Sequence, residues 1–202
     1  FCKIVNSGFF SQLFLLTFYN ANYIINKSIL QSFTFAIQIY QFQRELMHEP
    51  INWKDSYYYS KDRIVLTNEQ VPVPGIRVLA HHLMTSAIPA LESHYHENCF
   101  EFTIIFEGVF TFQAQGKNYT AAGSDIFVAY PNEVHSTNQV PLSHGEFYWL
   151  QLDVSSAENL LFLNRSAADS LIRCLHNLKR HIVKVRDNDI LPLLKTAFEL
   201  SI

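Results

Sequence analysis

Apolar and polar residues alternate along short segments in the middle of the chain, from about Arg63 to Asp153. Alternation with a period of two is the pattern of strands whose two faces meet different surroundings. Turn residues separate these segments at intervals of about 8–12 residues, which is the spacing of an antiparallel sandwich or barrel. The predicted strands are Arg63–Thr67, Ile76–His82, Phe100–Phe106, Val109–Gln115, Asn118–Ala121, Ile126–Tyr130 and Glu146–Asp153.

The third of these strands is the least polar. Its even-numbered positions are all apolar, and its odd-numbered positions are mixed. A strand with so little polarity is covered on both sides. We therefore expect the mixed face to point into the interior and the apolar face to lie under the helices that follow. The inward face is then Glu101, Thr103 and Ile105, and the outward face is Phe100, Phe102 and Ile104.

After Asp153 the apolar spacing changes to steps of three and four, which is the period of an α-helix. Two capping boxes, Ser155–Glu158 and Ser166–Asp169, predict helix starts, and Asp189 is a predicted cap for a further helix with Pro192 in its first turn. Along the second helix, five apolar residues form a seam like that of a coiled coil. We expect this seam to join two copies of the chain, with packing onto the strands as the alternative. Its residues are Leu171, Leu175, Leu178, Ile182 and Val185.

Residues 1–46 differ in composition from the rest of the chain, being rich in Phe, Ile, Tyr, Asn and Gln and poor in charge. The apolar run Phe9–Ile25 is interrupted by polar amides and lacks the flanks of a secretory signal. We expect this stretch to be a mis-assigned segment upstream of a start at Met47, with a membrane anchor or a genuine extension as alternatives. The predicted organisation is therefore an extension (1–46), a β-barrel (47–153) and a helical dimerisation and linker region (154–202).

Charge and cysteine content narrow the possible partners and compartment. The formal net charge is −3, and residues 47–202 carry −5, which argues against a broad nucleic-acid-binding surface. Three cysteines with no CxxC pair exclude a disulfide framework and a cysteine zinc site, and they suit a reducing compartment. We predict a cytoplasmic protein that binds no DNA by itself, and no membrane unless residues 1–46 are genuine.

Four residues carry the chemistry of the sequence. His94 and His96 are two apart, so they point to the same side of an extended chain. Glu101 opens the next strand after a turn, and His135 follows the turn at Pro131. Three imidazoles and one carboxylate suit Zn, Fe, Ni or Mn with open coordination positions. We expect a polar pocket lining that holds no cofactor, with such a metal site as the alternative. We expect these four residues, called the histidine cluster below, to converge on a small-molecule site inside the barrel.

The segments His94–Gly108 and Gly123–His135 resemble the two motifs of cupins. The stretch HYHENCFEFTIIFEGVFTFQAQGKNYTAAGSDIFVAYPNEVH is similar to the effector-sensing domain of AraC-type (arabinose-regulator) transcription factors. This resemblance covers about Ile76–Ile202 and implies a jelly-roll barrel, dimerisation helices and then two helix-turn-helix units, which need about 100 further residues. Two departures from metal-dependent cupin enzymes are the shorter spacing from Pro131 to His135 and the presence of Glu133 in place of Gly.

The resemblance implies the sensing and dimerisation part of a transcriptional regulator, a homodimer that binds a small polar effector such as a sugar and is not an enzyme. A metal-dependent cupin enzyme, either an oxygenase or a sugar isomerase, is the alternative, with the histidine cluster as metal ligands. A non-functional fragment is a third hypothesis. The expected ligand-binding residues are His94, His96, Glu101, Thr103, Phe112, Tyr130 and His135.

Overall fold

The structure is a computed structural model that describes residues 35–39, 50–185 and 190–202. The chain divides into two units, Phe1–His48 and Glu49–Ile202. In the first unit, the described residues 35–39 are helical. The remaining predictions for residues 1–46, and the predicted cap at Asp189, lie outside the described residues. In the part of the chain that is described, no helix is long and apolar enough to cross a membrane.

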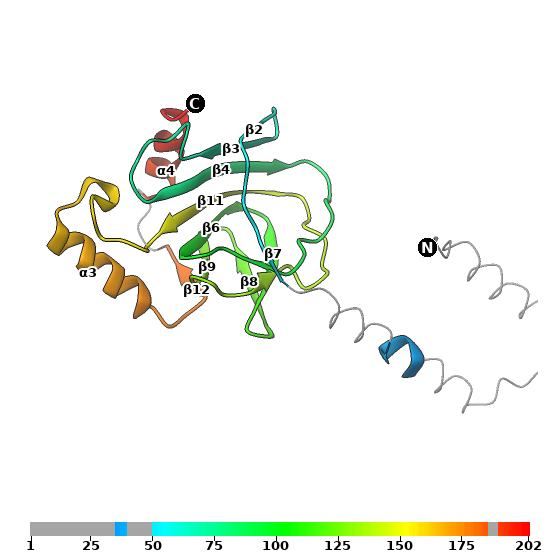
Figure 1. Cartoon of the computed structure of the whole chain (residues 1–202). Coiled ribbons are helices and arrows are strands. Elements are labelled where there is room, and N and C mark those ends of the chain that lie inside the picture. The colour runs from blue at the N-terminus through cyan, green and yellow to red at the C-terminus, as the bar shows by residue number, and fades with distance from the viewer. Residues whose placement is uncertain (1–34, 40–49, 186–189) are drawn as a thin grey trace, which may run out of the picture. The chain divides into compact units, whose positions relative to one another are not determined.

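The second unit is built mainly from two β-sheets that face each other (Figure 1). The smaller sheet has five strands in the order β1-β5-β10-β7-β8, and its pairs are antiparallel except for the parallel pair of β1 and β5. Its strands are β1 (Ile51–Asn52), β5 (His94–Tyr95), β7 (Val109–Ala114), β8 (Lys117–Ala122) and β10 (His135–Ser136).

The larger sheet has seven strands in the order β12-β9-β6-β11-β4-β3-β2, and all its pairs are antiparallel. The predicted mostly β class with C-terminal helices is confirmed. Among the described residues, no strand pairing joins the two sheets, so they form a two-layer arrangement. The strands are β2 (Tyr58–Tyr59), β3 (Arg63–Thr67), β4 (Ile76–Met84), β6 (Cys99–Glu107), β9 (Asp125–Ala129), β11 (Gly145–Asp153) and β12 (Ile182–Lys184).

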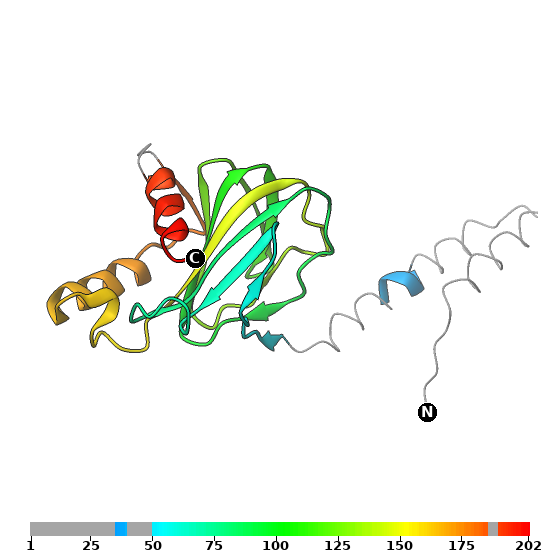
Figure 2. The same cartoon turned by 90° about the horizontal axis from the view of Figure 1, so that it is seen from above.

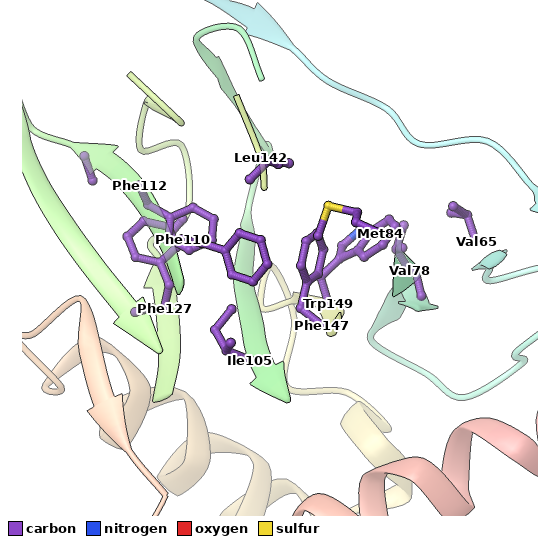
Figure 3. Packing of buried hydrophobic residues seen from close by; sticks show 14 residues of the cluster. Val65, Val78, Met84, Ile105, Phe110, Phe112, Phe127, Leu142, Phe147 and Trp149 are labelled. Carbon is purple, nitrogen blue, oxygen red and sulfur yellow. The ribbon is translucent and has the colours of Figure 1, made fainter. Parts of the chain in front are cut away.

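The main core lies between the inner faces of the two sheets. Phe110 and Phe112 of β7 pack against Ile105 and Phe127 of the larger sheet (Figure 3). The rings of Phe112 and Phe127 stack with their centroids 4.4 Å apart. Each fully buried ring contributes about 1.5–3 kcal/mol. The alternation along β7 therefore holds the smaller sheet in place over the larger one.

The turn between β6 and β7 needs glycine. Gly108 has φ +95°, and a Cβ atom there would lie 2.8 Å from the carbonyl oxygen of His144. A Cβ atom on Gly145 would lie 2.5 Å from the carbonyl oxygen of Glu107. The turn thus packs backbone to backbone against the start of β11, which fixes the position of β6 in the larger sheet.

Three helical elements follow β11, and they are η1 (Leu160–Phe162), α3 (Arg165–His176) and α4 (Ile190–Glu199). Figure 2 shows α3 and α4 on one side of the strands. Leu171 of α3 packs in the same apolar cluster as Phe102. Phe198 of α4 lies 5.3 Å from the ring of Tyr148 in β11. The expected orientation of β6 is therefore confirmed, since Phe102 lies under α3 while Ile105 lies in the core between the sheets.

The predicted continuous helical seam from Leu171 to Val185 is wrong. α3 ends at His176, and Lys179 adopts φ +47°, which a helix does not allow. The chain then forms β12, which pairs with β9 (Figure 1). Steps of three and four fit one long helix, but they also fit a short helix followed by a strand, and pairing satisfies the backbone groups at the edge of β9. The seam residues outside the helix are Leu178, Ile182 and Val185.

The predicted helix starts are also displaced. No helix begins at Ser155, where the chain forms turns before η1. The cap of α3 is Asn164, whose side-chain oxygen accepts a 3.0 Å hydrogen bond from the backbone N–H of Ala167. Ser166 therefore lies within the first turn. Asparagine and serine cap equally well, so the sequence alone favoured the wrong one of two close candidates.

Candidate functional site

A cavity of about 450 Å³ is lined by residues of both sheets. Its walls include Phe112 of β7 and Phe147 and Trp149 of β11. Polar groups enter it at two places, one formed by the histidine cluster and the other by Arg63 and its neighbour His82. Apolar walls with a few convergent polar groups are the usual form of a small-molecule site.

The histidine cluster converges as the sequence predicts. β5 and β10 pair at His94 and His135, which brings these two side chains together. One nitrogen from each of the three buried histidines lies within 4.8 Å of the others. Glu101 of β6 approaches from the larger sheet, with 2.8 Å from its Oε2 to His96 Nε2 and 3.5 Å from its Oε1 to His135 Nε2. The cluster thus joins the two layers of the fold.

Main-chain carbonyl groups orient all three imidazoles. A carbonyl oxygen only accepts, so each Nδ1 carries a proton and each Nε2 is left for the cluster. The Nε2 atom of His135 is buried with no hydrogen-bond partner, which marks it as an atom available for binding. The Nδ1–O distances are 2.7 Å from His94 to Glu92, 3.0 Å from His96 to Trp53 and 2.9 Å from His135 to Glu133.

The residues of the histidine cluster differ in the direction of their pKa shifts. Burial, followed by the charge of His135, lowers the pKa of His94 to about 4, so His94 is neutral at pH 7. Burial opposes charge on His96, but its contact with Glu101 outweighs burial and leaves the pKa of His96 raised. Burial alone would raise the pKa of Glu101, yet His135 and His96 hold that pKa well below its ordinary value. Glu101 therefore favours the charged form of His96, while His94 beside it is neutral.

These donors fit a divalent metal ion. Imidazole nitrogens and a carboxylate oxygen are common ligands of Zn, Fe, Ni and Mn. Metal-binding histidines usually donate their other ring N–H to a carbonyl or carboxylate, as all three do here. His94, His96 and His135 would hold the ion, with Glu101 beside them, and the ion would supply Lewis-acid polarisation of an oxygen atom on a bound molecule.

The sequence did not reveal three polar residues at the site, namely Asp55, Arg63 and Gln151. The side-chain amide of Gln151 donates to Asp55 Oδ2 at 2.8 Å and to Glu101 Oε2 at 3.0 Å. It therefore bridges two carboxylates. Burial, followed by the charge of Glu101, raises the pKa of Asp55. Gln151 follows Trp149 on the inward face of β11, so a polar residue at an apolar position was the available signal.

The other predicted ligand-binding residues divide into two groups. Thr103 and Phe112 line the cavity as expected. Tyr130 is not among the residues that line this cavity, so its role in ligand binding stays a prediction. Phe127 and Ala129 point into the core, so the next position points outward, where the Tyr130 hydroxyl accepts a 2.9 Å hydrogen bond from the N–H of Arg180.

The chain thus belongs to the class of two-sheet β domains that hold a small-molecule cavity between their sheets, with a histidine- and glutamate-lined centre. Residues 74–200 match the family described as AraC-like ligand binding domain. The chain is a member of this family, and the resemblance found in the sequence, including its cupin-type jelly roll, is confirmed.

Solved structures include loosely similar proteins. A protein described as a predicted oxalate decarboxylase from Thermotoga maritima shares 22% identity over 45% of this chain and 77% of its own, with a TM-score of 0.38. A cupin protein from Bacteroides fragilis shares 15% identity over 51% of this chain and 86% of its own, with a TM-score of 0.37. No curated protein matches the sequence significantly. At these similarities, the two structures carry no argument about ligand or activity.

Proposed function

We propose that this chain is the effector-sensing part of a cytoplasmic transcriptional regulator. A small polar molecule, such as a sugar, binds in the cavity, and its binding controls DNA recognition by a helix-turn-helix region elsewhere in the regulator. The chain itself makes no specific DNA contact. The observation that carries this proposal is the cavity of about 450 Å³ with convergent polar groups, in a chain of the AraC-like ligand binding family.

The unsatisfied atoms of the site support ligand binding. Three buried side-chain atoms of the described residues have no hydrogen-bond partner: Arg63 Nε, His135 Nε2 and Gln151 Oε1. Arg63 and His135 line the cavity, and Gln151 bonds to Asp55 and Glu101 of its lining. Buried polar atoms in native proteins nearly always have partners. A polar ligand would provide partners for these groups.

A route for coupling runs through β11. Trp149 of this strand lines the cavity, while its neighbour Tyr148 faces the other way and packs under Phe198 of α4. A ligand that shifts Trp149 therefore also shifts Tyr148, the next residue of β11, and with it the contact between Tyr148 and α4. Couplings of about 1–3 kcal/mol between sites are typical of allosteric proteins.

The proposed dimer forms through α4. Its exposed side carries Ile190, Leu193 and Ala197, and Leu200 in the turn directly after α4 continues the same spacing of three, four and three. Leu193 is 66% exposed and Leu200 is 84% exposed. Such spacing is the seam of a two-stranded coiled coil, so a second copy of the chain would cover it.

Calorimetric titration of the full chain against a panel of sugars tests the sensing function. We expect at least one sugar to bind, and Thr103→Phe to abolish binding because the added ring occupies the cavity. Replacement of the exposed Thr120 by Phe is the matched control. A folded wild-type chain that binds no member of the panel would count against the proposal.

A metal-dependent cupin enzyme is the second candidate, favoured by three buried histidines whose ring nitrogens, one from each, lie within 4.8 Å of one another. Metal-loaded full chain is incubated with candidate substrates, and oxygen uptake or sugar isomerisation is followed over many turnovers. Turnover that is lost in His94→Ala, while an exposed control such as His144→Ala retains it, would establish the enzyme. Effector binding without turnover supports the sensor.

A further inference from the structure

Arg63 occupies an unusual position for an arginine. In β3, Val65 belongs to the core between the sheets, so Arg63, two residues earlier, shares its inward face. Its strand partner is His82, and both line the cavity. Its Nε atom is buried with no hydrogen-bond partner, and among the described residues no carboxylate pairs with the guanidinium group.

Two aromatic rings hold this guanidinium group in place. Its Cζ atom lies 5.6 Å from the ring centroid of Trp149 and 5.7 Å from that of Tyr58. Trp149 is a cavity wall, whereas Tyr58 is exposed on the edge strand β2. Stacking leaves the edge of a guanidinium plane free, and that edge is the donor fork that binds a carboxylate through two parallel hydrogen bonds. The fork is therefore oriented before any ligand arrives.

The charges around the cavity limit what this fork can bind. Arg63 is the one arginine or lysine among the described residues that line the cavity, whereas Asp55, Glu92 and Glu101 contribute carboxylates. Burial, followed by the charge of Arg63, lowers the pKa of the adjacent His82 to about 4, so His82 adds no positive charge at pH 7. A single arginine, with three carboxylates in the same lining, favours a ligand with a single negative charge over a dianion such as a phosphate ester.

The distance between the two polar parts indicates the size of the ligand. Trp149, under the guanidinium group, and Gln151, beside Glu101, are neighbours on the inward face of β11. Two residues along a strand span about 7 Å. At the second part, Asp55, Glu101 and the unpartnered Gln151 Oε1 are hydrogen-bond acceptors, so the ligand must present donors there.

We propose that the effector is a small hydroxylated monocarboxylic acid of the sugar-acid class, with its carboxylate on Arg63 and its hydroxyl groups toward Asp55, Glu101 and Gln151. This inference rests on the proposed sensing function and replaces a neutral sugar by an acidic one. Arg63 is thus the residue that determines specificity for the anion.

The test compares acids with neutral sugars of the same shape. Isothermal titration of the full chain uses galacturonate against galactose, glucuronate against glucose, and inorganic phosphate. We expect one acid to bind about 10–100-fold more tightly than its neutral partner, as a charge-assisted bidentate pair provides. Arg63→Gln should remove this difference, Arg63→Lys should restore part of it, and Lys61→Gln, at an exposed site two residues away, should leave it unchanged. Circular dichroism and thermal melting establish that each variant is folded.

Three results would overturn the inference while leaving the sensor intact: equal or tighter binding of the neutral sugars, acid binding that Arg63→Gln does not weaken, or phosphate binding as tight as that of the acids. Failure of the acids and of the neutral sugars to bind folded wild-type protein contradicts both the inference and the proposed function. Acid-selective binding that depends on Arg63 supports both.

Discussion

His135 is the member of the histidine cluster whose Nε2 atom has no hydrogen-bond partner, although it lies in the interior of the fold. Its Nδ1 atom donates to the carbonyl oxygen of Glu133, so the ring cannot turn without losing that bond. The ring is therefore held in the orientation that a metal ligand needs.

The metal-dependent alternative predicts that the full chain binds one Zn²⁺ or Mn²⁺ ion at His94, His96 and His135. His135→Ala should weaken metal binding by more than about 100-fold, because even the loss of an outer-shell partner of a ligand costs about 10–100-fold. Metal content after dialysis and titration calorimetry give the stoichiometry and affinity. His144→Ala, at an exposed histidine, is the control. Equal metal binding by the wild type and His135→Ala would place the ion elsewhere.

The lowered pKa of His82 predicts how the free energy of unfolding depends on pH. Its pKa is about 4 in the folded protein and 6.5 in an unperturbed chain. The unfolded state therefore takes up the proton first, so the free energy of unfolding should fall as pH decreases from about 6.5 to 4. Urea unfolding of His82→Gln should show a smaller fall over this range than the wild type. Identical pH profiles for the two proteins would contradict the assignment.

The sequence predicted residues whose position follows from local alternation or spacing. The faces of β6 and the convergence of His94 and His96 are of this kind. Asp55 and Arg63 reach the cavity through the register of the strands and the path of the chain before β3, which are long-range features. Gln151 was visible as a polar residue on an apolar face, but its two carboxylate partners come from distant segments.

Asn164 and Ser166 are the two candidates for the residue that caps the start of α3, and their substitution by alanine distinguishes them. Asn164→Ala should lower the free energy of unfolding by about 0.5–2 kcal/mol, because its side chain satisfies the N–H of Ala167. Ser166→Ala should change it by less than about 0.5 kcal/mol, since Ser166 is exposed within the helix. Chemical denaturation of both variants measures the difference. A larger effect for Ser166→Ala than for Asn164→Ala would place the start of the helix at the predicted capping box, Ser166–Asp169.

Elements were predictable where one periodicity was unambiguous. The long strands β6 and β11 occupy nearly their predicted ranges because their alternation extends over several residues. The region after α3 was mistaken because its apolar residues fit a helical period, whereas Ile182 and Val183 are β-branched and pair with β9. The choice between a continued helix and the strand β12 depends on the edge of β9 that is free to pair, and this edge exists only in the assembled sheet.

Association is a property of the whole molecule. The double variant Leu193→Lys and Leu200→Lys places one charge on the exposed side of α4 and one in the turn directly after it. We expect the wild type to sediment as a dimer and this variant as a monomer, because a charge buried in a coiled-coil seam is costly. Glu199→Lys, on another side of α4, is the control and should remain dimeric. A variant that is still dimeric would place the interface elsewhere.

Three of the four edges of the described sheets are short strands, and the fourth edge is the six-residue strand β8. The larger sheet stops at β12, with three residues, on one side and at β2, with two residues, on the other, and the smaller sheet stops at the two-residue β1. A long, flat edge strand can pair with strands of further chains and so start aggregation. The edge strands β12, β2 and β1 are too short for extended pairing of this kind. A chain with 49% hydrophobic residues is thereby protected against strand addition at these three edges, and β8 is the described edge strand with enough length to pair with a strand of another chain.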